Sequence, residues 1–401
     1  MIDVVLCASG SDEVRIVHGM AHEHEQEVRI VRRAADLAET LAVARAGIVD
    51  AVLIDLDVRG LDRDVLADML DREVAVVGLV RPDGRSGTTT LGLRHVVPCD
   101  AALEEIVAAL TRATGEEEPA LEDPTSAPGS GADEGSRRGP LIAVWGPVGA
   151  PGRSTVAVNL AHELSRSDRG TVLVDADTQG PCLSQLLGVL DEAPGLVAAC
   201  RAASRDTLDS ETLDRLLPTV LPGLRLLGGI GVPSRWTELR ESSLDGVWDA
   251  LAARGEVLVV DVGFGLEDDE EQAFDSLAPR RNAATITALR RADLVVAVAG
   301  ADPVGLTRLL RDADRLRELG APAPHVVVNR LGPPAPSDRV RELVTGRMEV
   351  ASLQTLPDDP ATRRRAVWDG TVLAEAGPRS ALRRAVREWA DRIGDAALVG
   401  D

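Results

Sequence analysis

The stretch from Leu141 to Leu164 reads LIAVWGPVGAPGRSTVAVNLAHEL, and it indicates a strand, a glycine loop and a helix in that order. The apolar run from Leu141 to Trp145 predicts a buried strand, and a turn rich in Gly and Pro follows it. After the turn, apolar residues recur at helical spacing. This is the layout of a phosphate cradle, in which loop N–H groups and the helix N-terminus hold an anion. The stretch therefore predicts an α/β fold with a phosphate-binding loop.

The loop departs from the standard phosphate-binding pattern GxxxxGK[ST] at two positions. Pro147 stands where the pattern has its first Gly, and Arg153 stands where it has Lys. Gly152 and Ser154 fit the pattern, and a hydroxyl at the first helical turn is the group that binds Mg²⁺. Taken by itself, the loop is equally consistent with an ordinary strand–turn–helix connection.

The composition predicts a folded chain with room for two domains. The chain has 401 residues, and its net charge of −21 argues against a general affinity for nucleic acid. All 44 basic residues are Arg, so Arg153 reflects a chain-wide bias as well as its own site. The four cysteines (Cys7, Cys99, Cys182 and Cys200) lack CxxC spacing, which favours small buried side chains in a reducing cytosol over a zinc site. We find no signal peptide and no apolar run of the ~20 residues that span a bilayer, so we expect a cytoplasmic protein.

Residues 1–112 alternate between strand-like and helix-like segments, which predicts a small parallel sheet. We expect strands at Val4–Cys7, Val28–Val31, Ala51–Leu56, Val74–Val80 and His95–Val97, and helices at Ala34–Ala46 and Ala101–Leu110. In the same part of the chain, His18, His22 and His24 fit either a metal site or an exposed polar stretch, and their spacing favours the polar stretch.

The segment AVLIDLDVRGLD (residues 51–62) resembles the third strand of a response-regulator receiver domain. The resemblance implies a CheY-like fold with Asp55 at the position of the phospho-accepting aspartate. Receivers also carry an acidic pair after the first strand and a Lys before the Pro that follows the last strand. This chain has Ala8, Ser9 and Val97 at those places. We therefore expect a pseudo-receiver that is not phosphorylated and that serves as a docking or dimerisation module.

Residues 113–139 change in composition to Gly, Pro, Ser and acidic side chains, with Leu121 as the one large apolar residue. Such a segment buries too little apolar surface to fold, so it predicts a disordered linker. We therefore expect a pseudo-receiver over 1–112, the linker over 113–139, a nucleotide-binding domain over 140–393 and a tail over 394–401.

Two further segments place carboxylates at the ends of predicted strands. The strand Thr171–Val174 runs into Asp175 and Asp177, and the apolar run in EVLVVDVGFG (256–265) ends in Asp261. Carboxylates at strand ends beside a phosphate loop are placed to act on water or on groups bound to Mg²⁺. The alternative is a set of solvated turn residues, which the nearby glycine loop disfavours.

Together these motifs resemble the MinD/ParA superfamily of P-loop ATPases over about residues 140–393. VGAPGRS (148–154) is similar to the deviant loop KGGxGK[ST] of that family, VDADTQG (174–180) to its switch I, and LVVDVG (258–263) to its Walker B strand. HVVVNR (325–330) and LPDD (356–359) are similar to its adenine-binding segments. The resemblance implies a mostly parallel sheet flanked by helices.

The resemblance also implies which residues hold ATP and Mg²⁺. Ser154 would bind Mg²⁺ directly and Asp261 through water, with Asp175 as a further candidate ligand. Asp177 would orient the attacking water, and Arg153 would pair with phosphate during catalysis. The nucleotide itself would be bound by Gly149, Ala150, Pro151, Gly152, Arg153, Ser154, Thr155, Asn329, Arg330 and Pro357.

Two departures from the family pattern bear on catalysis. Val148 replaces the Lys that reaches the nucleotide of the partner subunit, and Arg153 replaces the second Lys. A planar guanidinium is not equivalent to the point charge of an ammonium group. We therefore expect an ATP-linked homodimer that binds nucleotide and hydrolyses it slowly or not at all.

A pseudo-receiver, a linker and this ATPase form the layout of the CpaE/TadZ pilus-assembly branch and of actinobacterial septum-site-determining relatives. The resemblance implies a cytoplasmic protein that a partner recruits to a pole or septum. There it would position Flp/Tad pilus or secretion machinery, or the division septum, with partners bound through the pseudo-receiver. Two alternatives stay open: a nucleotide-independent scaffold, and a DNA-binding partitioner, which the charge of −21 disfavours.

Two further features of the second half of the chain are explained by ordinary packing or by exposure to solvent. The closing helix at about Ser380–Ile393 has an apolar stripe that favours core packing over direct membrane anchoring. Arg280 and Arg281, after the Walker B strand, fit either a partner contact or a solvated face.

Overall fold

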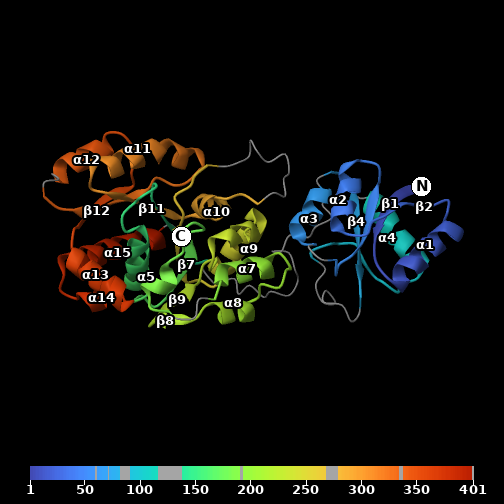
Figure 1. Ribbon diagram of the computed structural model, residues 1–401, viewed down its shortest axis with the longest axis horizontal. Helices are drawn as coiled ribbons and strands as arrows, with labels where there is room; N and C mark the ends of the chain where they lie inside the picture. Colours follow the sequence, from blue (N-terminus) through green and yellow to red (C-terminus); the bar gives the residue numbers. More distant parts are fainter. Residues whose placement is uncertain are drawn as a thin grey trace. The chain divides into compact units, whose positions relative to one another are not determined.

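The computed structural model describes residues 1–58, 61–70, 72–81, 91–115, 138–189, 193–267, 279–333 and 337–399. Contacts along the chain divide it into two compact units, one built mainly from Met1–Ala132 and the other mainly from Asp133–Asp401. Figure 1 shows the helices and strands of both. Most of the predicted linker, 116–137, lies outside the described residues.

The first unit is a five-stranded parallel sheet in the order β2-β1-β3-β4-β5. This order is that of flavodoxin-like doubly wound folds. The strands are β1 (Ile2–Cys7), β2 (Val28–Arg33), β3 (Ala51–Asp55), β4 (Ala75–Val80) and β5 (Val96–Pro98), and the helices are α1 (Ser11–His22), α2 (Leu37–Arg45), α3 (Arg63–Leu70) and α4 (Leu103–Gly115). All five expected strands are present, whereas α1 and α3 were not among the expected helices.

The second unit is an eight-stranded sheet in the order β13-β12-β11-β6-β10-β7-β9-β8, parallel except for the pair β8–β9. The α/β prediction of a mostly parallel sheet flanked by helices is thereby confirmed. The strands are β6 (Leu141–Trp145), β7 (Thr171–Ala176), β8 (Thr219–Leu221), β9 (Leu224–Leu227), β10 (Val257–Val262), β11 (Leu294–Gly300), β12 (His325–Leu331) and β13 (Ser352–Pro357).

Helices cover both faces of this sheet (Figure 1). They are α5 (Arg153–Leu164), α6 (Leu183–Leu186), α7 (Gly195–Ala203), α8 (Ser210–Leu216), α9 (Glu241–Ala252), α10 (Ala283–Arg291), α11 (Pro303–Glu318), α12 (Ser337–Thr345), α13 (Pro360–Asp369), α14 (Leu373–Ala376) and α15 (Ala381–Val399), with a 3₁₀ helix η2 at Pro233–Glu238. None of the helices described is long and apolar enough to cross a bilayer.

A separate core forms on each face of the sheet because successive residues of a strand point to opposite sides. In β6, Trp145 belongs to the core under α9 and α10, and Val144 to the core under α5 and α15. The predicted stripe of α15 lies in this second core, where Leu382, Val386, Trp389 and Ile393 are all at most 3% exposed. The closing helix therefore packs as core, as its stripe indicated.

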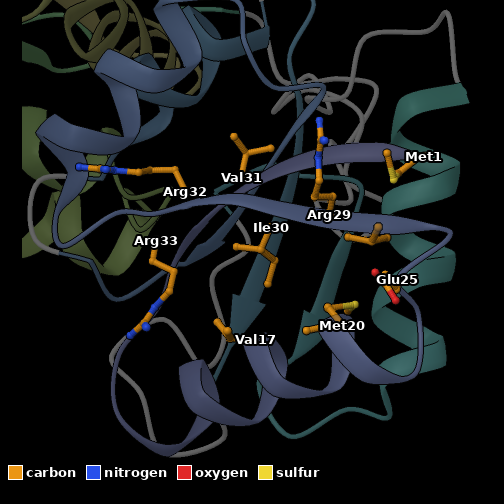
Figure 2. Close-up of a pocket in the computed structure, with 11 residues that line it drawn as sticks. Met1, Val17, Met20, Glu25, Arg29, Ile30, Val31, Arg32 and Arg33 are labelled. Carbon is orange, nitrogen blue, oxygen red and sulfur yellow. The ribbon is translucent and has the colours of Figure 1, made fainter.

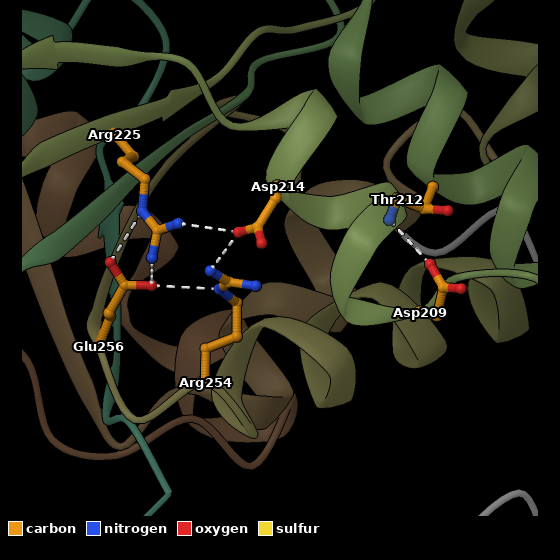
Figure 3. A network of polar contacts seen from close by, with 6 residues as sticks. All are labelled: Asp209, Thr212, Asp214, Arg225, Arg254 and Glu256. Atoms are coloured by element: carbon orange, nitrogen blue, oxygen red, sulfur yellow. Dashed lines mark hydrogen bonds and ion pairs between the residues drawn. The ribbon is translucent and has the colours of Figure 1, made fainter.

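An ion-pair network joins the amino ends of β9 and β10 to the helices beside them (Figure 3). Glu256 accepts from Arg225 and from Arg254, and Asp214 of α8 accepts from the same two arginines. The network ties together the amino ends of these strands, which lie away from the glycine loop. The carboxyl ends of β6, β7, β10, β11 and β12 lie together on the opposite side of the sheet, where ligands of such sheets bind.

Candidate functional site

The loop between β6 and α5 requires glycine at two positions. Gly149 and Gly152 have φ angles of 73° and 83°, a region that residues with a Cβ rarely adopt. A Cβ on Gly152 would also lie 2.6 Å from Nδ2 of Asn329. That amide donates to the carbonyl of Pro151 at 2.7 Å, so the end of β12 holds the loop in place.

Arg153, the first residue of α5, turns its side chain toward two carboxylates. Its Nε donates to Oδ1 of Asp261 at 3.1 Å, and its Nη2 forms an ion pair with Oδ2 of Asp177. Only 12% of the arginine side chain is exposed. The structure therefore brings the loop, the end of β7 and the end of β10 together through one guanidinium group.

Burial and charge act in opposite directions on this group. Burial disfavours the charge of Arg153, but Asp261 and Asp177 more than offset it, so the pKa of the guanidinium is raised. Burial also raises the pKa of Asp261, and the charge of Arg153 counteracts that rise. The three side chains therefore form one buried cluster, in which each charge depends on its neighbours.

Asp175 lies in register with Asp261 on the adjacent strand and is 2% exposed. Its Oδ2 accepts from the backbone N–H groups of Cys182 and Leu183 at 2.9 and 3.0 Å, which ties the start of α6 to β7. Burial, with repulsion from Asp261, raises the pKa of Asp175 to about 7. Asp175 thus has a structural role here in addition to its predicted place beside a metal.

Asp177 is held from both sides, since its Oδ1 accepts from the N–H groups of Gln179 and Gly180 at 2.9 and 3.2 Å. Its other oxygen faces Arg153. Both oxygens of this carboxylate are therefore held by groups of its own unit.

The oxygen atoms at the site suit a hard cation such as Mg²⁺. Oδ2 of Asp261 and Oδ1 of Asp175 are buried without a hydrogen-bond partner, and the hydroxyl of Ser154 lies close enough to Asp261 to lower its pKa. Across the described ranges, no three His, Cys, Asp or Glu side chains gather as a protein-only metal site. Mg²⁺ at this position would accordingly take further ligands from a nucleotide and from water.

The predicted base-binding residues lie at the ends of β12 and β13. Asn329 is 4% exposed, and both of its amide atoms have protein partners, the carbonyl of Pro151 and the N–H of Arg330. Arg330 has a φ of 61°, which is unusual for a residue with a side chain. Pro357 pairs in register with Leu331 at the sheet edge. Contact of Asn329 with a base would therefore require its amide to leave the loop.

A cavity of about 610 Å³ opens beside this end of the site. Its walls come from the loop, from the start of α11 and from α12, and its polar groups include two arginines. The lining residues include Pro151, Pro303, Leu306, Val340, Arg330 and Arg339. An apolar cavity with a few charged groups next to a phosphate loop has the character of a small-molecule site.

Sequence reasoning missed two residues that shape the loop. Arg308 of α11 donates to the carbonyl of Val148 at 3.0 Å, and the side chain of Val148 is 47% exposed. The thiol of Cys182 lies beside Ser154, and burial raises its pKa to about 11. No sequence signal marked either residue, because an isolated Arg on a helix and an isolated Cys after a turn are common.

Other predicted candidates lie elsewhere. Arg280 pairs with Glu241 at 3.3 Å, and the guanidinium of Arg281 lies 5.2 Å from the ring centre of Trp236, so both contact their own unit. His24 bonds to Glu27 at 2.9 Å, whereas the rings of His18 and His22 lie against one another.

In the first unit, Asp55 is 5% exposed at the end of β3. Its Oδ2 accepts from Nε of Arg81 at 2.9 Å, and the same arginine reaches the carbonyl of Ser9. A guanidinium thus pairs with the carboxylate at the end of β3.

The same unit has a groove of about 710 Å³ between β2 and α1, which Figure 2 shows with Val17, Met20 and Ile30 at its floor. Arginines of β2 line the groove as well, and Arg29 and Arg33 are paired with Asp3 and Glu13. The groove therefore offers an apolar floor with neutralised charges at its edge.

Comparison with known proteins agrees with this geometry. The family model ParA, described as NUBPL iron-transfer P-loop NTPase, matches residues 139–212. An iron–sulfur cluster carrier protein of Aquifex aeolicus is 28% identical over 236 residues, which are 55% of this chain and 58% of that protein. The chain therefore spans less than two thirds of the length of that relative.

Two solved structures have the same fold. The ParA family ATPase of Chlorobium tepidum matches with a TM-score of 0.54 and 18% identity, over 64% of this chain and 99% of its own. The septum site-determining protein MinD of Pyrococcus horikoshii, solved with Mg-ADP, matches with a TM-score of 0.52 and 20% identity, over 63% and 95%. The family model thus covers β6, the glycine loop, α5 and β7, and the two solved structures share the fold of the second unit.

Proposed function

We propose that this P-loop NTPase is an ATP-binding organiser of the MinD/ParA type that hydrolyses ATP slowly or not at all. The observation that carries the proposal is the cluster at the carboxyl ends of β6, β7 and β10. A glycine loop with two left-handed glycines, a hydroxyl at Ser154 and the carboxylates of Asp177 and Asp261 meet there. This donor set suits a nucleoside triphosphate with Mg²⁺. Such a site promotes phosphoryl transfer by positioning and by electrostatic stabilisation.

The expectation of slow hydrolysis rests on two side chains. Arg153 stands at the place of the family's second loop Lys, and its planar guanidinium is not equivalent to the point charge of an ammonium group. Val148, at the place of the family's cross-subunit Lys, presents only an apolar side chain to solvent. Both features favour a bound nucleotide over a reacting one.

We assign the cellular role by layout. A flavodoxin-like unit that precedes this NTPase suits the CpaE/TadZ branch and its septum-site-determining relatives, which position pilus, secretion or division machinery. In this assignment the first unit is a pseudo-receiver that binds partners, and the NTPase forms an ATP-linked homodimer. The pairing of Asp55 with Arg81 favours a docking role over a phosphorylation switch.

The first experiment is thermal unfolding of the full chain with Mg-ATP, with Mg-ADP and with EDTA. A site filled at about 100 times its Kd adds about 2.7 kcal/mol to the free energy of unfolding, which shifts the Tm by several degrees. Sedimentation with and without Mg-ATP then tests the dimer, and phosphate release tests hydrolysis. Turnover at the rate of lysine-bearing relatives, abolished in Asp177→Ala, would contradict the proposed slow hydrolysis.

Three other functions would each be recognised by a different observation. A nucleotide-independent scaffold predicts no shift with any nucleotide. A DNA partitioner predicts a salt-sensitive DNA complex, which the net charge of −21 disfavours. An iron–sulfur carrier would need exposed thiolates, but Cys7, Cys99 and Cys200 are buried and no two cysteines have CxxC spacing.

A further inference from the structure

The Arg153 guanidinium stands where α5, β7 and β10 meet. It lies between the ends of β7 and β10, with Nε 3.1 Å from Oδ1 of Asp261 and Nη2 paired with Oδ2 of Asp177. Asp261 is fully buried and Asp177 is 7% exposed. The cation that neutralises these two carboxylates is therefore part of the protein chain.

The same two carboxylates are the ones that a metal–nucleotide complex would use. Oδ2 of Asp261 and the hydroxyl of Ser154 would face Mg²⁺ and the water bound to it. The carboxylate of Asp177 would orient the reacting water. A guanidinium and a divalent cation compete for these carboxylates, because both are attracted to the same negative charge.

We propose that Arg153 makes this site selective for the metal–nucleotide complex over either the free metal ion or the free nucleotide. This inference rests on the proposed nucleotide binding. In the structure, Arg153 holds Asp177 and Asp261. A phosphate group would give the guanidinium a new anionic partner, and a divalent cation would give the carboxylates a new cationic partner. Only the metal–nucleotide complex supplies both partners at once.

Each component alone meets an unfavourable exchange. A free divalent ion must displace Arg153 and leave a buried guanidinium without its anions. A free nucleotide that draws Arg153 away leaves two buried carboxylates without a cation, and these repel the phosphates of the nucleotide. Removal of one partner from a buried ion pair is costly because the remaining charge stays desolvated.

The planar fork of arginine is necessary for this behaviour. Its Nε and Nη2 reach different carboxylates at once, whereas lysine offers one compact charge. A lysine at position 153 should therefore release the carboxylates more readily, although it keeps the positive charge.

The test measures Mn²⁺ binding without nucleotide, by the loss of the free-ion EPR signal, in the full-length chain. Arg153→Gln should bind Mn²⁺ about tenfold or more tightly than the native chain, with Arg153→Lys in between, a size typical of coupling between sites. Arg308→Gln is the matched control, because it removes the same charge from the loop rim without touching the carboxylates. Arg153→Lys also serves if Arg153→Gln fails to fold.

A second arm compares ATP with EDTA against ATP with Mg²⁺, by titration calorimetry. The native chain should bind the complex at least about tenfold more tightly than free ATP, and Arg153→Gln should show a weaker coupling between metal and nucleotide. Equal Mn²⁺ affinity in the native chain and Arg153→Gln, or equal affinity for ATP with and without Mg²⁺, would overturn the inference. If no nucleotide binds under any condition, the proposed function fails, and the Mn²⁺ arm still decides the role of Arg153.

Discussion

Nε of Arg153 lies 3.1 Å from Oδ1 of Asp261, so the residue that follows the glycine loop is tied to the end of β10. The loop is thereby fixed to the sheet. This contact has consequences for stability that can be separated from nucleotide binding.

Replacement of Arg153 by Met should lower the free energy of unfolding by about 3–5 kcal/mol in EDTA, because two buried carboxylates lose their cation. The double variant Arg153→Met, Asp261→Asn should recover at least about 1 kcal/mol of that loss, since one of the uncompensated charges is then gone. Urea denaturation of both single variants and the double variant measures this coupling. Strictly additive effects would show that the ion pair does not contribute to stability.

Asp175 should make the stability depend on pH. Its folded pKa is raised to about 7, above the unfolded value, so the folded state binds a proton more tightly and stability is lost as pH rises through the folded pKa. Asp175→Asn imitates the protonated form and avoids this loss. From about pH 5 to about pH 8, the stability of the variant relative to the native chain should therefore rise by about 2–3 kcal/mol.

The measurement is urea denaturation in EDTA at several pH values. Asp209→Asn is the control, because a backbone N–H of Thr212 lowers the pKa of Asp209 and its carboxyl stays ionised over this range. Its difference from the native chain should stay flat. A flat difference for Asp175→Asn as well would contradict the raised pKa.

Gly152→Ala should distort the loop beyond the ordinary cost of a left-handed residue. The φ of 83° is strained for alanine, and the added Cβ would meet Nδ2 of Asn329 at 2.6 Å. Gly320→Ala is a matched control, since its φ is 77° and nothing lies within 4 Å of the added Cβ. We expect about 1–3 kcal/mol of destabilisation for Gly320→Ala and a larger value for Gly152→Ala, measured by thermal unfolding. Equal values would mean that the amide of Asn329 does not hold the loop.

The sequence predicted the positions of the strands better than those of the helices. It indicated which segments form the site, but not which side chains contact one another there. Buried parallel strands are continuous apolar runs, so β6, β7 and β10 were evident. Helix α1 escaped because its sequence SDEVRIVHGMAH carries a mid-helix Gly and scattered polar residues. Asp175 and Asp261 are the next-to-last residues of β7 and β10, near the strand ends that the apolar runs indicated.

What the sequence did not predict is the direction of one side chain. Arg153 was expected to point toward phosphate, but its side chain points toward Asp177 and Asp261. This choice depends on the register of three strands distant in sequence, which no local pattern encodes. The amide of Asn329 likewise bonds to Pro151 because β12 and the loop meet only in the folded sheet.

Asp55 should resist phosphorylation by acetyl phosphate and Mg²⁺. Its Oδ2 accepts from Arg81 at 2.9 Å, and Ala8 and Ser9 supply no carboxylate to hold the metal. Intact mass and peptide mapping after treatment measure the outcome, with a receiver that has the complete acidic pair treated in parallel. A phosphate on the peptide that contains Asp55 would contradict the pseudo-receiver assignment.

The two tryptophans near the chain end should respond very differently to substitution. Trp389 of α15 is 1% exposed in the core under α5, whereas Trp368 of α13 is 86% exposed. Trp389→Ala should lower the free energy of unfolding by about 3–5 kcal/mol through the lost burial and the cavity left behind. Trp368→Ala removes a side chain of the same type from an exposed position, and it should change the free energy of unfolding by less than about 0.5 kcal/mol. Urea denaturation of both variants tests the assignment of α15 to the core, because a helix that only anchors the chain to a membrane would leave stability unchanged when Trp389 is lost.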